Sequence, residues 1–170
     1  MIKRALFPMA MLALSALPAT AIDEAPLATN VSRSTEAPHS AEVRGIIEAI
    51  VALPPASREE RRSGSTAQQQ LFDQLIALGP EAVPAIIDQM DDHRPLPNQA
   101  ISLTNHAPDA FEGIRQYAPK VMVDALAAVL NQLTGENFGF IYNGGTPVER
   151  AAAVRGWRQY LDDLPDPSAS

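Results

Sequence analysis

The sequence contains no cysteine. It therefore cannot form disulfide bonds, supply a thiol nucleophile or thiolate zinc ligands, or carry a lipid on an N-terminal cysteine. Without disulfides, the fold depends on its apolar core. Residues 41–164, the part that we predict to be ordered, have about the length of one typical domain, which buries roughly two-thirds of its unfolded surface.

Signatures of catalysis are also scarce. The chain has three histidines. It has no Gly-x-Ser-x-Gly turn to present a nucleophilic serine, and no glycine-rich phosphate loop between a strand and a helix. We therefore predict a protein that is not an enzyme, with no catalytic residue, no cofactor and no metal site. The alternative is a cell-envelope hydrolase that uses His93 or His106 with neighbouring carboxylates.

One group of acidic residues and a histidine stands at the end of a predicted helix. Asp88, Asp91, Asp92 and His93 could form a weak cation site or simply a solvated helix end. Zinc sites need three or four converging ligands, and spacing alone does not show convergence. Whether Asp91, Asp92 and His93 bind a cation is left open.

Long apolar segments are missing after residue 21. Before it, Lys3 and Arg4 precede a mostly apolar stretch over 5–17, and the small residues Ala19 and Ala21 follow. This is the layout of a secretory signal peptide. The stretch is shorter than the roughly 20 residues that a membrane-spanning helix needs. We expect cleavage near Ala21, a periplasmic or secreted mature protein, and no membrane span after cleavage.

Positive charge is in the minority. The chain has 13 Lys and Arg against 20 Asp and Glu, for a formal net charge of −7. Cleavage would remove two basic residues and no acidic one, which makes the mature charge −9. Such a surface repels nucleic-acid phosphates and anionic membranes. The predicted partner is another protein, and a basic protein would complement this charge; the oligomeric state is left open.

Four regions follow from composition and periodicity. We predict a signal peptide over 1–21, a flexible tether rich in Pro, Ser and Thr over 22–40, a helical domain over 41–164 and a disordered tail over 165–170. Within the domain, apolar residues recur at helical spacing. Helices are expected between Ser40 and Pro54, over 66–78, 80–90 and 109–117, from Pro119 to Gly135, and over 146–164, with a brief extended piece at 101–104.

The segment from Leu75 to Ile87, LIALGPEAVPAII, joins two predicted helices through a short turn. It resembles the centre of a HEAT repeat at Gly79, Val83 and Pro84 as well as at Ile87, and the clear match covers residues 66–91. The resemblance implies a protein-binding scaffold. We therefore predict an all-α protein, a compact HEAT-like bundle of antiparallel helical hairpins.

The loop over 136–145, ENFGFIYNGG, is the best candidate for a contact surface. Its aromatic residues alternate, so that one side could pack inward while the other meets a partner; alternatively, all of them cover the end of the hairpin. Aromatic residues are enriched where binding energy concentrates. The predicted partner-binding residues are Phe138, Phe140, Tyr142 and Asn143. The predicted function is an exported, non-enzymatic module for protein–protein binding, with an inhibitor or immunity-type protein as its most concrete form.

Overall fold

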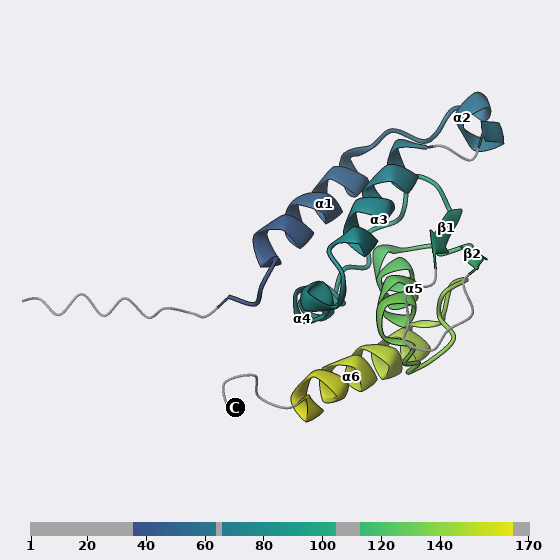
Figure 1. Ribbon diagram of the computed structural model, residues 1–170. Coiled ribbons are helices and arrows are strands. Elements are labelled where there is room, and N and C mark those ends of the chain that lie inside the picture. Colours follow the sequence, from purple (N-terminus) through teal and green to yellow (C-terminus); the bar gives the residue numbers. More distant parts are fainter. Residues whose placement is uncertain (1–35, 64–65, 105–112, 165–170) are drawn as a thin grey trace, which may run out of the picture. The chain divides into compact units, whose positions relative to one another are not determined.

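The computed structural model describes residues 36–63, 66–104 and 113–164. Within these ranges the chain forms six α-helices, one 3-10 turn and two strands (Figure 1). The elements are α1 (Ser40–Ala52), α2 (Arg58–Ser63), α3 (Ala67–Ala77), η1 (Pro80–Ala82), α4 (Val83–Asp88), β1 (Ile101–Thr104), β2 (Ile114–Tyr117), α5 (Met122–Thr134) and α6 (Pro147–Asp163).

Several predictions fall outside these ranges. The predicted signal peptide, the predicted tail, His106 and most of the predicted tether are not among the described residues. α1 begins at Ser40, one residue before the predicted start of the helical domain. Among the described residues, no helix is long and apolar enough to cross a membrane.

The helix ends have local causes. The Glu149 N–H donates to the Thr146 hydroxyl at 3.3 Å, and the Thr146 N–H donates to the Glu149 carboxylate at 2.7 Å. This reciprocal pair caps the start of α6, and the hydrogen bond from the Thr146 N–H lowers the pKa of Glu149. α5 ends at Gly135, whose φ of 80° is a left-handed conformation that glycine adopts without strain.

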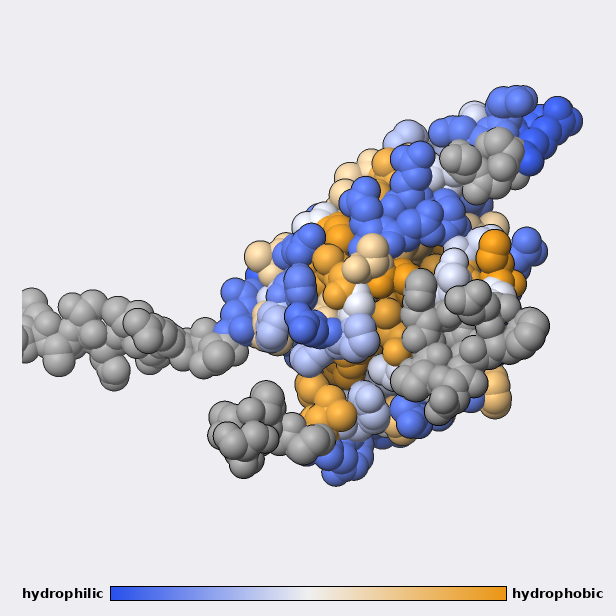
Figure 2. Space-filling model, viewed as in Figure 1, coloured by the Kyte–Doolittle hydropathy of each residue, from blue (hydrophilic) through white to orange (hydrophobic). Residues whose placement is uncertain are grey.

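α5 forms the centre of the core. Every residue from Met122 to Leu130 is buried. α5 packs against α3, α4 and α6, and Figure 1 shows it between α3 and α6. In Figure 2, hydrophilic residues cover α2, and apolar residues reach the surface between α3 and α6. α1 contributes a single apolar stripe, as its predicted helical spacing requires: Val43, Ile46, Ile47 and Ile50.

The predicted all-α, HEAT-like bundle of hairpins is wrong. β1 and β2 form an antiparallel sheet in which Ile101 lies opposite Tyr117 and Thr104 opposite Ile114. The helix predicted over 109–117 is a strand at 114–117, and its first residues lie outside the described ranges. β2 is only four residues long and three of its side chains are exposed, so hydropathy carries no strand signal there. The helix predicted over 80–90 is divided into η1 and a six-residue α4.

The sheet is held to α3 by two glutamine side chains. The Gln69 amide donates to the Ser102 carbonyl at 2.6 Å and accepts from the Ser102 N–H at 2.8 Å. Gln68 makes the same two-way contact with Asn98, at 2.8 and 2.9 Å. Gln69 therefore occupies the place that a further strand would take beside β1 and covers this edge. Thr66 caps the start of α3 by accepting from the Gln69 N–H at 3.0 Å, but the Gln69 side chain does not bond back to Thr66 because it is committed to β1 and Asp73.

Candidate functional site

The loop between α5 and α6 is fixed at its start. The Asn131 amide donates to the Glu136 carbonyl at 2.8 Å, and the Glu136 N–H donates to the Thr134 hydroxyl at 3.1 Å. Within the loop, the Gly139 N–H donates to the Asn137 side chain at 2.9 Å. The loop thus carries its aromatic residues on a backbone that is hydrogen-bonded along its length.

Phe138 anchors the loop to α6. Its ring meets the Trp157 ring edge to face, with 4.9 Å between centroids, and lies 6.0 Å from the Tyr160 ring. Opposite it stands Gly156, where an added Cβ would lie 2.5 Å from the Phe138 Cβ. The absence of a side chain at Gly156 is therefore what allows Phe138 to seat against the helix.

Tyr142 also points inward. It is 8% exposed, its hydroxyl donates to the Asn137 side chain at 3.0 Å, and its ring meets Tyr117 edge to face at 5.5 Å. Burial raises the pKa of Tyr142 to about 12, and the nearby Tyr117 acts in the same direction. Tyr142 therefore joins the loop to β2, the strand that carries Tyr117.

Asn143 makes a second link to the segment after β2. Its side-chain oxygen accepts a hydrogen bond from the Ala118 N–H at 2.7 Å. The residue itself is exposed. This amide therefore fixes the distance between the loop and the end of the strand.

Phe140 alone among these aromatics projects outward. It is 84% exposed, and its only ring contact among the described residues is the edge of Tyr142, at 6.2 Å. The loop thus points Phe138 and Tyr142 inward and Phe140 outward. The three rings thus alternate along the loop, and the two inward ones are anchored to different elements, Phe138 to α6 and Tyr142 to β2.

Phe140 and Tyr142 border an open groove of about 540 Å³ between β2, the end of α5 and the loop. We call it the aromatic groove. Its lining residues are Arg115, Gln116, Tyr117, Asn131, Gly135, Asn137, Phe140 and Tyr142. Arg115 and Tyr117 fall within the helix predicted over 109–117 and were therefore not predicted as site residues. Their only signal was a cationic and an aromatic residue two positions apart, which share one face of a strand.

The histidine and carboxylates at the end of α4 do not converge. Asp91 pairs with Arg158, and Asp92 pairs with Arg94 at 2.7 Å. In the part of the chain that the structure describes, no three His, Cys, Asp or Glu side chains are placed to hold a metal ion.

His93 lines a second groove, of about 580 Å³. Asp91 is the one carboxylate among the described residues that line it, and Arg150, Arg155 and Arg158 line it too. A hydrolase centred on His93 calls for a second carboxylate, which these lining residues do not supply.

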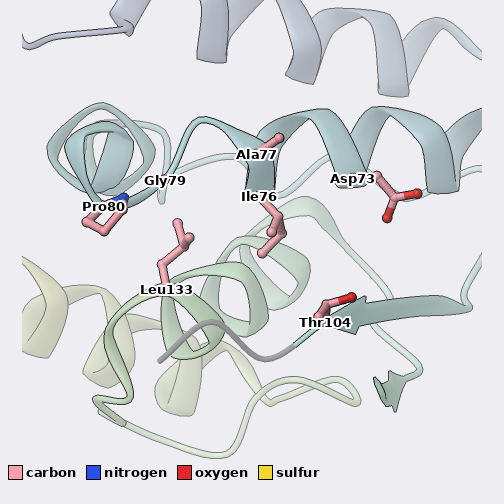
Figure 3. Close-up of a pocket in the computed structure, with 7 residues that line it drawn as sticks. All are labelled: Asp73, Ile76, Ala77, Gly79, Pro80, Thr104 and Leu133. Atoms are coloured by element: carbon pink, nitrogen blue, oxygen red, sulfur yellow. The ribbon is translucent and has the colours of Figure 1, made fainter. Parts of the chain in front are cut away.

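A third pocket, of about 450 Å³, opens between α3, η1 and the end of α5 (Figure 3). Ile76 and Leu133 point into it, with Asp73 and Thr104 at its polar side. Both apolar side chains belong to the core, at 7% and 3% exposed. The aromatic groove is the stronger candidate because it combines a projecting aromatic ring with several polar side chains.

No protein-family model, curated protein or solved structure matches this chain. The resemblance of residues 66–91 to the centre of a HEAT repeat is therefore not tested and stays a prediction.

Proposed function

We propose that this chain is an exported, non-enzymatic module that binds another protein, and that the aromatic groove is its contact surface. The observation that carries the proposal is Phe140, a large aromatic side chain that is 84% exposed on a loop held by hydrogen bonds and ring contacts. Binding energy concentrates at a few such aromatic residues. A surface that is already ordered also loses little conformational entropy on association.

The net charge of −7 supports a more concrete form of this proposal. A protein that neutralises a basic toxin or hydrolase outside the cytoplasm, as an inhibitor or immunity-type protein does, gains association rate from an acidic surface. Binding of this kind weakens as salt rises. Affinity that is independent of salt, or an acidic partner, would contradict the basic-partner form.

The test compares Phe140→Ala with a matched control, Val148→Ala. Val148 is 78% exposed at the start of α6 and does not line the aromatic groove. A partner is captured from the fraction outside the cytoplasm and purified, and its affinity for each variant is measured. We expect Phe140→Ala to weaken binding about 30-fold, as at an interface hot spot, and Val148→Ala to leave it unchanged. Equal affinities of Phe140→Ala and the unmodified chain would refute the assignment of the surface.

A further inference from the structure

The direction of one hydrogen-bond chain determines what the aromatic groove offers to a ligand. The Glu136 carbonyl can only accept, so the Asn131 amide nitrogen faces it at 2.8 Å. The Asn131 oxygen then accepts from the Gln132 amide nitrogen at 2.9 Å. The same Gln132 nitrogen donates to the Tyr117 hydroxyl at 2.8 Å. Tyr117 is therefore an acceptor in this chain, and its own proton is directed elsewhere.

The Gln132 amide keeps this orientation although, within the described ranges, one of its polar atoms is left without a hydrogen bond. Gln132 is 1% exposed, and among the described residues its side-chain oxygen has no hydrogen-bond partner. Rotating the amide would bring this oxygen against the Asn131 oxygen, which is the worse arrangement. No described residue accepts the Tyr117 proton. Tyr117 is half-buried and is among the residues that line the groove, so an acceptor bound there could take this proton.

Arg115 supplies a second donor on the same face. It lies two residues before Tyr117 on β2, so both side chains leave the strand on one side. Arg115 is exposed and has no ion pair within the described ranges. It is also the one charged residue among those that line the groove. The groove is thus locally cationic in a chain whose net charge is −7.

We propose that the aromatic groove binds an acidic side chain of the partner that stands next to an apolar one. The carboxylate accepts the Tyr117 proton and pairs with Arg115, while the apolar neighbour packs on Phe140. A terminal carboxylate is usually captured by a nest of backbone N–H groups, whereas the donors here are side chains. The partner as a whole can still be basic, because long-range attraction and the local contact depend on different charges. This assignment rests on the proposed binding role.

The test uses three short peptides and nuclear magnetic resonance titration of the full chain. The first probe is N-acetyl-Phe-Glu-Leu-amide, the second has Gln in place of Glu, and the third, N-acetyl-Phe-Ala-Leu, has a free carboxyl terminus. We expect the Glu probe to shift the Phe140 and Tyr117 signals and to bind about tenfold or more tightly than the Gln probe. Equal binding of the two, no shift at these residues, or equally tight binding of the third probe would overturn the assignment.

Three variants separate the donors from general effects of charge. In Arg115→Gln and in Tyr117→Phe, the preference for Glu over Gln is expected to fall toward one. Arg155→Gln is the matched control, because Arg155 is an exposed arginine in the other groove and has no ion pair among the described residues. It should keep the full preference. Loss of preference in Arg155→Gln would mean that net charge alone is responsible.

The affinity for the captured partner distinguishes the carboxylate assignment from the proposed binding role. If Phe140→Ala weakens the partner complex and Arg115→Gln does not, the binding role stands and the carboxylate assignment fails. If neither weakens it, the binding role itself fails. Arg115→Gln is suited to this comparison because the side chain is exposed, so the variant should fold normally.

Discussion

Replacing Gln69 by glutamate tests how the sheet is held to the helices. The Gln69 nitrogen donates to the Ser102 carbonyl at 2.6 Å and to the Asp73 carboxylate at 2.8 Å. In Gln69→Glu both donors become acceptors, so an added negative charge faces a carbonyl and a carboxylate. The hydrogen bond from the Ser102 N–H, at 2.8 Å, is the only one of the three that the variant can keep.

The expected loss of stability is about 2–3 kcal/mol. A part-buried carbonyl without its donor costs about 1–3 kcal/mol, and like charges four residues apart on a helix add a few tenths. The introduced carboxylate should have a raised pKa in the folded protein, because protonation restores a donor. The loss of stability in Gln69→Glu should therefore be smallest below the unfolded pKa of about 4.3, and it should grow as the pH rises through the higher pKa of the folded protein.

Urea unfolding of Gln69→Glu and Gln70→Glu provides the measurement. Gln70 is the neighbouring residue, is exposed and undergoes the same chemical change, so its variant should stay within about 0.5 kcal/mol of the unmodified chain. The midpoint for Gln69→Glu should fall by about 1 M or more at neutral pH and recover in acid. Equal midpoints for the two variants at neutral pH would refute the role assigned to Gln69.

Two further predictions concern groups inside the domain. Asp124 is fully buried and paired with the Arg150 guanidinium at 2.7 Å, so Asp124→Ala should lower the free energy of unfolding by about 3–5 kcal/mol. The double variant with Arg150→Ala should lose much less stability than the sum of the two single variants. Additive losses in urea unfolding would contradict the pairing. Tyr142, with its pKa raised to about 12, should ionise well above the free value of about 10 in an ultraviolet titration. The stability from its burial is complete below about pH 10 and is lost as the pH rises toward 12, a loss that Tyr142→Phe should remove; ionisation of all tyrosines near pH 10 would count against it.

The parts of the fold that depend on neighbouring residues could be predicted from the sequence. The helix predicted to end at Gly135 and the helix predicted to start at residue 146 are confirmed by α5 and α6. Both ends are set by neighbouring residues: a glycine after α5, and the Thr146 and Glu149 cap of α6. The sheet is different in kind. Ser102 is held by Gln69, 33 positions away, and no local pattern announces that a glutamine in the first turn of a helix will bond a strand.

The candidate site likewise has one part that local sequence predicts and one part that depends on tertiary contacts. The aromatic loop led to the prediction of Phe138, Phe140, Tyr142 and Asn143, of which Phe140 and Tyr142 line the aromatic groove and the other two do not. Which rings face inward depends on contacts with α6 and β2 that the spacing does not show. Arg115 and Tyr117 come from a strand that pairs with β1, and their arrival beside the loop follows from tertiary contacts. Their chemistry was visible in the sequence, but their location was not.

Gly156 affects two properties of the chain in opposite directions: the stability of α6 and the packing of Phe138 against it. Glycine inside a helix costs about 1 kcal/mol relative to alanine, yet the missing methyl group is what leaves room for the Phe138 ring. A descendant or designed sequence with alanine there would gain helix propensity and would have to push the loop outward. Selection for a more stable helix therefore favours alanine at position 156, whereas selection for the present conformation of the contact loop favours glycine.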